Sequence, residues 1–261
     1  MVYRNFWLLI AAGLVLPACN FSSDKNKATT EESKEIEGKQ MGKTIFSFFG
    51  APGSGKGTLA ERCVEKLNFK VLSTGNLCRS AMTKDDEKSK LITSIIKEGK
   101  LVPDELISDM VEDWLSKETA DNKTIILDGY PRTAKQAELL LNLLNTNFKD
   151  YKFRVVSIIV PEEEIVDRIT NRVMCENKAC QTTYSLKLMK DPTNLICEKC
   201  GSKLIRRQDD TEQVVRERLS VYAKYSDDVL SFYRKNNIKI EEINASKLSV
   251  DEVYENFTKI L

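Results

Sequence analysis

The chain has 261 residues, of which 30% are charged and 41% hydrophobic, and its formal net charge is +1. This balance is typical of a globular protein with one sizeable core. A net charge near zero gives no bulk attraction to nucleic acid, so no nucleic-acid partner is expected. Because the sequence contains no histidine, histidine-dependent catalytic triads and histidine zinc sites are excluded.

Residues 1–40 have the composition of a leader followed by a polar tether. Arg4 precedes an apolar run over 6–16, which is too short to span a bilayer and has the length of a secretory-signal core. The stretch LPAC, ending at Cys19, resembles the lipid-attachment box of bacterial lipoproteins, and the polar segment behind it would be disordered. The alternative is a start at Met41, with a cytoplasmic protein and a leader that arises from a wrongly assigned start codon. The sequence leaves both possibilities open.

Beyond residue 43, strand patterns alternate with helix patterns. Strands are expected at 44–49, 69–72, 123–127, 154–160 and 238–243. Helices are expected at 58–67, 75–98, 103–117, 133–145, 161–172, 210–236 and 249–260. Asp210 is the expected N-cap of the long helix, with Gln213 completing a capping box, and the cysteine-bearing segment before it is expected to be irregular. The alternation predicts an α/β fold with a mostly parallel five-stranded sheet between helices and a ligand at the strands' carboxyl ends.

A glycine-rich loop follows the first predicted strand. The stretch GAPGSGKGT, which begins at Gly50, fits the spacing G-x-x-x-x-G-K. Such a loop directs backbone N–H groups at phosphates and leads into a helix whose N-terminus also favours anions. The general motif has Ser or Thr directly after the lysine. Here Gly57 stands there and Thr58 follows, which is the form found in nucleoside monophosphate kinases. The loop therefore predicts a bound nucleotide, held by Gly53, Ser54, Gly55, Lys56, Gly57 and Thr58.

Five further segments, in sequence order, resemble one family. They are STGNLCR from Ser73, GKLVPD from Gly99, DGYPRT from Asp128 with Gln136 beyond, RITNR from Arg168, and RQDD from Arg207 leading to VRERL. Together with the loop, they make residues 43–260 similar to the adenylate kinases of the long-lid bacterial type. The resemblance implies a monomeric kinase that converts ATP and AMP into two ADP with Mg²⁺. It also implies a phosphate-loop core (41–72, 103–170 and 211–261), an AMP-binding insert (73–102) and a lid (171–210).

The resemblance also implies a role for each motif residue. The groups expected to act in catalysis are Lys56, Asp128, Arg132, Arg168, Arg172, Arg207 and Arg218. Asp128 would hold Mg²⁺ through water, and the arginines would neutralise the phosphates. Besides the loop, the residues expected at ATP are Arg168, Arg172, Thr183, Tyr184 and Lys247. Those expected at AMP are Thr74, Arg79, Lys100, Leu101, Val102, Gly129, Tyr130, Pro131, Arg132, Gln136, Arg207 and Arg218.

Four of the seven cysteines form two pairs within the predicted lid: Cys175, Cys180, Cys197 and Cys200. Four thiolates around one Zn²⁺ would make a closed structural site that stiffens the lid. Two disulfides, or four free thiols, are the alternatives, and disulfides would be favoured if the chain were exported.

Two other functions stay open at this point. One is a kinase for another monophosphate, such as UMP or CMP. The other is a catalytically silent, membrane-tethered nucleotide-binding zinc module. The motifs also leave open whether ATP or GTP is the better phosphoryl donor.

Overall fold

A five-stranded sheet, parallel throughout, forms the centre of the protein, with strand order β2-β3-β1-β4-β8. The computed structural model describes residues 43–81, 87–119 and 123–261. The strands of this sheet are β1 (Thr44–Phe49), β2 (Lys70–Ser73), β3 (Ile125–Asp128), β4 (Lys152–Ile159) and β8 (Ile240–Asn244). The prediction of a mostly parallel five-stranded sheet is therefore confirmed. The expected leader, with its lipid-attachment box at Cys19, lies outside the described residues.

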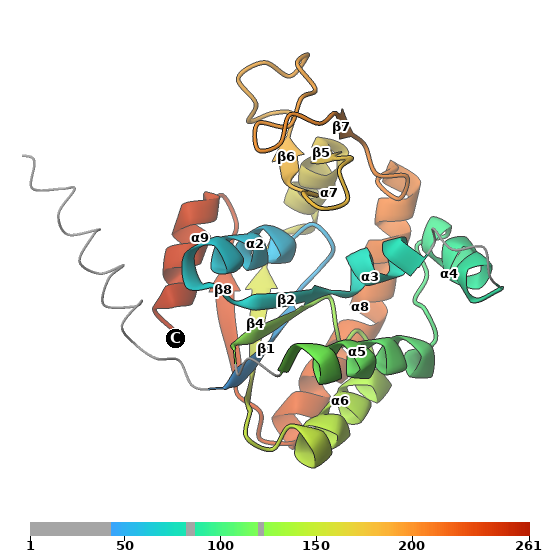
Figure 1. The fold of residues 1–261 in the computed structure, drawn as a ribbon, viewed down its shortest axis with the longest axis vertical. Helices are drawn as coiled ribbons and strands as arrows, with labels where there is room; N and C mark the ends of the chain where they lie inside the picture. Colours follow the sequence, from blue (N-terminus) through green and yellow to red (C-terminus); the bar gives the residue numbers. More distant parts are fainter. Residues whose placement is uncertain (1–42, 82–86, 120–122) are drawn as a thin grey trace, which may run out of the picture. The chain divides into compact units, whose positions relative to one another are not determined.

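Helices cover both faces of the sheet (Figure 1). In chain order they are α2 (Lys56–Leu67), α3 (Thr74–Ala81), α4 (Glu87–Lys97), α5 (Asp104–Glu118), α6 (Ala134–Asn147), α7 (Glu162–Thr170), α8 (Glu212–Lys235) and α9 (Val250–Thr258). Side chains alternate along β1, so that Ile45 packs with α5 and α6 while Phe46 packs with α2 and α9. Both faces of the strand are buried, as a parallel sheet requires.

A small antiparallel sheet stands between α7 and α8. It has the strand order β6-β5-β7, from β5 (Arg172–Cys175), β6 (Thr183–Ser185) and β7 (Leu204–Ile205). The expectation of an irregular cysteine-bearing segment is wrong here. The strands are two to four residues long, and strands this short carry too few alternations to be recognised in sequence.

The N-cap of α8 also differs from the expectation. Thr211, not Asp210, is the N-cap, and its side chain accepts a hydrogen bond from the Val214 N–H. Asp210 is unavailable for capping because its carboxylate pairs with Arg172 and Arg218. A tertiary ion pair has thus overridden a local capping signal.

Candidate active site

The phosphate loop connects the central strand β1 to α2. Gly50, Gly53 and Gly55 all have positive φ, at 144°, 83° and 100°. A Cβ on Gly50 would lie 2.4 Å from the Ile158 carbonyl oxygen, so neither the space nor the backbone conformation admits a side chain there. The glycines thus allow the loop to turn tightly at the carboxyl end of β1 and to enter α2 directly.

Lys56 folds back over this loop. Its Nζ donates hydrogen bonds to the carbonyl oxygens of Gly50 and Ala51, each at 2.8 Å. Burial lowers the pKa of Lys56 to about 8, and the nearby positive charges of Arg132, Arg218 and Arg172 lower it further against an opposing effect of Asp128. An amine whose charge is this poorly compensated is well suited to an anionic ligand.

Asp128 ends β3, which pairs with β1 so that Phe48 and Asp128 are in register. A Cβ on Gly57 would lie 3.5 Å from Asp128 Oδ2. The carboxylate and the start of α2 are therefore neighbours, and the glycine that replaces the usual Ser or Thr leaves the space between them open. The structure brings Lys56 and Asp128 to the same edge of the sheet.

Several residues that are expected to bind AMP, the phosphoryl acceptor, lie next to Asp128, on the turn after β3. Gly129 has φ of 77°, and its carbonyl oxygen accepts hydrogen bonds from Thr74 Oγ1 (2.9 Å) and Arg132 Nε (2.8 Å). A Cβ on Gly129 would lie 2.9 Å from Arg132 Nη2. Only glycine therefore lets Arg132 fold back over the turn, close to the start of α3.

Arg79, on α3, belongs to the same group. Its Nη2 donates to Asn76 Oδ1 at 2.5 Å, while its Nε is buried without a hydrogen-bond partner among the residues that the structure describes. Burial lowers the pKa of Arg79, and Arg172 and Arg132 lower it further against the opposing charge of Asp209. Arginines from three distant parts of the chain therefore influence one another.

Two of these arginines come from the start of β5 and from α8. The Arg172 guanidinium donates to Asp210, and Arg218 Nη1 lies 3.2 Å from Asp209 Oδ2. Burial lowers the pKa of Arg218 to about 10; Asp209 opposes this, whereas Arg172 and Arg132 add to it. The cluster is thus rich in positive charge and only partly neutralised by two aspartates.

Arg206 and Arg207 are adjacent but differ in environment. Arg206 is exposed, and its Nη1 donates to the Thr170 carbonyl oxygen at 2.6 Å. Arg207 is partly buried, and its Nε approaches Met174 Sδ at 3.0 Å. Burial lowers the pKa of Arg207 to about 10, and Arg172 and Arg79 lower it further. Arg207 rather than Arg206 therefore joins the cluster.

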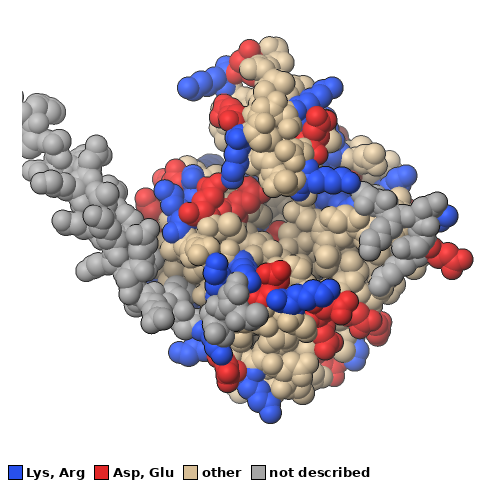
Figure 2. All heavy atoms as spheres, viewed as in Figure 1, with Lys and Arg blue, Asp and Glu red and all other residues tan. Residues whose placement is uncertain are grey.

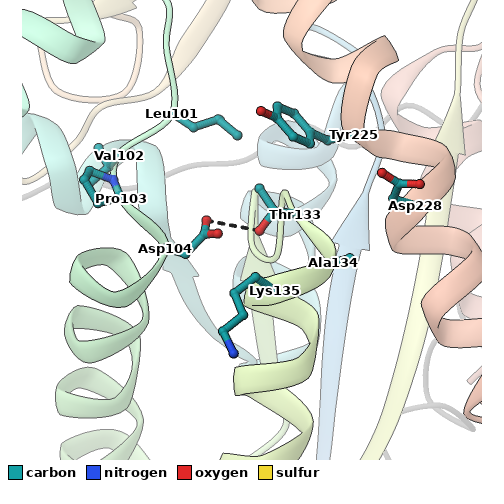
Figure 3. A pocket seen from close by; sticks show the side chains of 9 residues that line it. All are labelled: Leu101, Val102, Pro103, Asp104, Thr133, Ala134, Lys135, Tyr225 and Asp228. Carbon is teal, nitrogen blue, oxygen red and sulfur yellow. Dashed lines mark hydrogen bonds between the residues drawn. The ribbon is translucent and has the colours of Figure 1, made fainter.

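Gln136, expected at the AMP base, is engaged within the protein. Its Oε1 accepts from the Arg132 backbone N–H at 2.7 Å, and its Nε2 donates to Asp104 Oδ1 at 2.8 Å. Thr133 Oγ1 donates to the same Asp104 oxygen at 3.1 Å (Figure 3). The amide thus fixes the turn that carries Arg132. Tyr130 and Pro131, in the same turn, are buried, and the Tyr130 hydroxyl lies 2.8 Å from Ser108 Oγ.

Leu101 and Val102 line a pocket of about 390 Å³ at the start of α5 (Figure 3). Thr133, Tyr225 and Asp228 line it from the other side. Lys100 is exposed and pairs with Glu98, so its side chain is turned to solvent. Of the three residues expected to read the AMP base here, Leu101 and Val102 line the pocket and Lys100 does not.

The remaining residues expected at ATP are more dispersed. Arg168 reaches the phosphate loop, with Nη1 3.4 Å from the Ser54 carbonyl oxygen. Thr183 and Tyr184 lie on β6, where the Tyr184 hydroxyl is 3.3 Å from Cys197 Sγ. Lys247 has φ of 57°, and its N–H donates to Glu164 Oε1 at 3.1 Å. Tyr184 therefore belongs to the cysteine cluster, whereas the backbone of Lys247 is tied to α7.

The four paired cysteines converge. Their sulfur atoms all lie within 4.8 Å of one another, with Cys175 and Cys200 3.3 Å apart and Cys180 and Cys197 3.8 Å apart. A disulfide bond would be about 2 Å long, whereas sulfurs at about 2.3 Å from a shared ion in a tetrahedron lie nearly 4 Å apart. The donor set and its spacing fit one tetrahedral metal ion. Cys63 and Cys78 are buried in the core instead.

Charges of both signs are interspersed over the face shown in Figure 2. No broad basic field is visible on this face, in keeping with the net charge of +1. In the part of the chain that the structure describes, no helix is both long and apolar enough to cross a membrane.

Sequence reasoning assigned no role to two acidic residues that organise the site, Asp104 and Glu164. It assigned Asp210 only a helix cap, not its ion pairs with Arg172 and Arg218. Asp104 and Asp210 stand inside recognised motifs, GKLVPD and RQDD, and that position was a usable signal. Glu164 is one of three consecutive glutamates, and nothing in the sequence distinguishes it from its neighbours.

Comparison with known proteins agrees with this geometry. The family model described as adenylate kinase matches residues 48–238. Proteins named adenylate kinase from Thermosipho africanus and Archaeoglobus fulgidus are 41% and 38% identical over 214 residues, which is 82% of this chain and 97% and 96% of theirs. One from Clostridium tetani is 36% identical over 212 residues, 81% of this chain and 95% of its own. A phosphate loop on a parallel sheet, faced by clustered arginines, defines a nucleotide-binding class. Within that class, this chain belongs to the adenylate kinase family.

Proposed function

We propose that this protein catalyses the reversible transfer of a phosphoryl group from ATP to AMP, giving two ADP. One observation carries the proposal. Lys56, Asp128 and arginines from α3, the β3 turn, β5 and α8 converge beside one phosphate loop, in a chain of the adenylate kinase family. Curated relatives with this name match the chain over nearly their whole length.

The chemistry explains why so much positive charge is gathered. The bond between the γ-phosphorus of ATP and the bridging oxygen breaks, and a bond from that phosphorus to an AMP phosphate oxygen forms. The two nucleotides are anions that repel each other, so catalysis consists mainly of bringing them into line and neutralising charge on the moving group. Arginine suits this task, because its planar fork matches phosphate oxygens.

We assign the donor phosphates to the phosphate loop, Lys56, Arg168 and Arg172. The acceptor phosphate is assigned to Arg79, Arg132 and Arg218, with Arg207 between the two nucleotides. The proximity of Arg132, Arg172 and Arg218 to Lys56 supports placing both phosphates beside one phosphate loop, and the division between donor and acceptor follows the family resemblance. Thr74, Gly129 and the pocket beside Leu101 and Val102 would receive the rest of the AMP molecule. Gln136 would support Arg132 from behind.

Two metal ions belong to the proposal. Mg²⁺ accompanies ATP and, when bound, neutralises phosphate charge. Asp128 is the residue that would hold it, through water, because its carboxylate faces the start of α2 beside Lys56. Zn²⁺ would be held by Cys175, Cys180, Cys197 and Cys200, where it would stiffen the small sheet and take no part in the reaction.

We also propose that the chain is divided into a core, an AMP-binding insert and a lid. The AMP-binding insert (73–102) and the lid (171–210) would close on the core when both nucleotides are bound. Closure would exclude water and so prevent ATP hydrolysis. We further propose that the kinase works as a monomer.

The test is a coupled assay of ADP formation from ATP, with AMP, CMP, UMP and GMP compared as acceptors. Turnover with AMP well above the other three is expected. A preference for CMP or UMP would reassign the enzyme to another monophosphate. Absence of turnover with every acceptor, by protein that still binds ATP, would instead indicate a silent binding module.

The cellular location is a separate proposal. A chain that starts at Met41 would be cytoplasmic, where ATP and AMP are available, whereas a lipid on Cys19 would make it a lipoprotein. Mass spectrometry of the N-terminus of the native protein distinguishes the two.

A further inference from the structure

Glu164, in the first turn of α7, connects two segments that are expected to bind ATP, the phosphoryl donor. Its Oε1 accepts a hydrogen bond from Arg168 Nη2 at 2.6 Å and another from the Lys247 N–H at 3.1 Å. Its Oε2 accepts from Ser246 Oγ at 2.8 Å. One carboxylate therefore fixes both an arginine of its own helix and a loop after β8.

Arg168 links this carboxylate to the phosphate loop. Besides Glu164, its Nη2 donates to the Ala245 carbonyl oxygen at 2.8 Å, and its Nη1 lies 3.4 Å from the Ser54 carbonyl oxygen. A Cβ on Gly55 would lie 3.7 Å from Nη1. The guanidinium thus spans from the loop after β8 to the rim of the phosphate loop, and Glu164 is its only acidic partner among the described residues.

In the loop after β8, the backbone N–H groups of Ala245, Ser246 and Lys247 all have acceptors within the protein. The Ala245 N–H donates to the Ile159 carbonyl oxygen at 2.9 Å, and the Ser246 N–H donates to Asn244 Oδ1 at 3.0 Å. Glu164 takes the third N–H, that of Lys247. These three residues can therefore offer a ligand carbonyl oxygens, which accept hydrogen bonds, but no free backbone N–H.

We propose that Glu164 is a positioning residue for the phosphoryl donor. It holds Arg168 against the phosphate loop, and it turns the N–H of Lys247 away from the ligand. A purine with an amino group facing this loop, as in ATP, finds acceptors there. A purine with a carbonyl oxygen in that place, as in GTP, leaves its acceptor unpaired, which is costly in a desolvated site. The inference rests on the proposed function and adds the residue that sets donor affinity and base preference.

The test compares Glu164→Gln with Glu163→Gln. Glu163 is the preceding residue on the same helix and is exposed, so its substitution makes the same chemical change away from the contacts. In E164Q, we expect KM for ATP to rise about fivefold, because charge-assisted hydrogen bonds to Arg168 and Lys247 are lost. KM for AMP should stay within about twofold, as should both constants in E163Q. The ratio of kcat/KM for ATP to that for GTP should fall in E164Q alone.

Thermal unfolding of each variant separates positioning from folding. A merely structural role would lower Tm and alter both KM values together. If E164Q proves unstable, Ser246→Ala removes a single hydrogen bond of the same carboxylate from a surface loop and should shift KM for ATP in the same direction. Unchanged KM for ATP and unchanged base preference in these variants would overturn the inference. Wild-type protein without turnover would overturn the proposed function itself.

Discussion

Asp210, which is buried, and Arg172, which is partly buried, form an ion pair at the base of the proposed lid. Arg172 Nε lies 2.7 Å from Asp210 Oδ2, and Nη2 donates to Oδ1. Arg172 begins β5 and Asp210 directly precedes the N-cap of α8, so the pair joins the two ends of the proposed lid. The Asp210 side chain is only 1% exposed, and Arg218 approaches it to 3.6 Å. Asp210 therefore holds two of the arginines proposed to bind phosphate.

Removal of this carboxylate should destabilise the nucleotide-free protein. Asp210→Asn leaves the partly buried Arg172 without its counter-ion, and breaking a buried pair from one side typically costs about 3–5 kcal/mol. We expect the free energy of unfolding, measured with urea, to fall by about 3 kcal/mol. Glu138→Gln, which breaks the exposed pair with Lys135, is the control and should change it by less than about 1 kcal/mol. Equal effects of the two substitutions would contradict the structural role of Asp210.

Binding of ATP should take up a proton at alkaline pH through Lys56. In the nucleotide-free protein its pKa is lowered to about 8, chiefly by burial. Bound phosphate favours the charged amine and raises this pKa, so at pH about 9 the uptake should approach one proton per site. At pH about 7 the amine is already protonated, and its uptake should be close to zero.

Calorimetry in buffers of different ionisation enthalpy measures this uptake. Lys56→Arg is the control, because a guanidinium stays charged throughout this range. The variant should bind ATP without alkaline proton uptake. Uptake that persists in the variant would assign the proton to another group.

Arg218 and Arg216 offer a matched pair on α8. Arg218 faces Asp209 and Asp210, whereas Arg216 is exposed and pairs with Glu212. Arg218→Ala should lower kcat/KM for AMP at least about a hundredfold, since it removes a charge proposed to hold the acceptor phosphate. Arg216→Ala should change it less than about twofold. Steady-state kinetics that show similar losses in both variants would remove Arg218 from the site.

The cysteine cluster should hold one zinc ion per chain, measured by inductively coupled plasma mass spectrometry. Cys197 is one of its four members and is 1% exposed. Cys197→Ser should abolish tight zinc binding and lower Tm, because metal binding is coupled to folding. Cys78→Ala changes a core cysteine outside the cluster and should retain the metal even if its Tm falls. Peptide mapping that finds the pairs oxidised, with no metal, would favour disulfides instead.

The sequence was most informative where local pattern and function coincide. The expected first strand, 44–49, matches β1 to the residue, because its flanking loop is as distinctive as its apolar run. The spacing of the four cysteines likewise predicted a cluster that the fold brings together.

Long-range partners were what the sequence could not supply. The side chain of Asp210 is well suited to capping a helix, but it pairs instead with Arg172, 38 residues away. Glu164 is fixed by a loop more than 80 residues further on, and Gln136 is turned inward by Asp104, 32 residues before it. These side-chain partners depend on which elements pack together in the fold, and the local pattern of apolar and polar residues does not predict them.

The pairing of β5 with β7 has a further consequence. Met174 lies opposite Ile205 in an antiparallel ladder, so the chain departs from α7 and returns to α8 at adjacent points. A segment with neighbouring ends can be lengthened, shortened or exchanged for another without moving the framework to which it is attached. The cysteine-bearing segment beyond this pairing should therefore tolerate exchange, and its stability could be adapted to temperature or redox conditions while Arg172 and Arg207, on either side of it, keep their places.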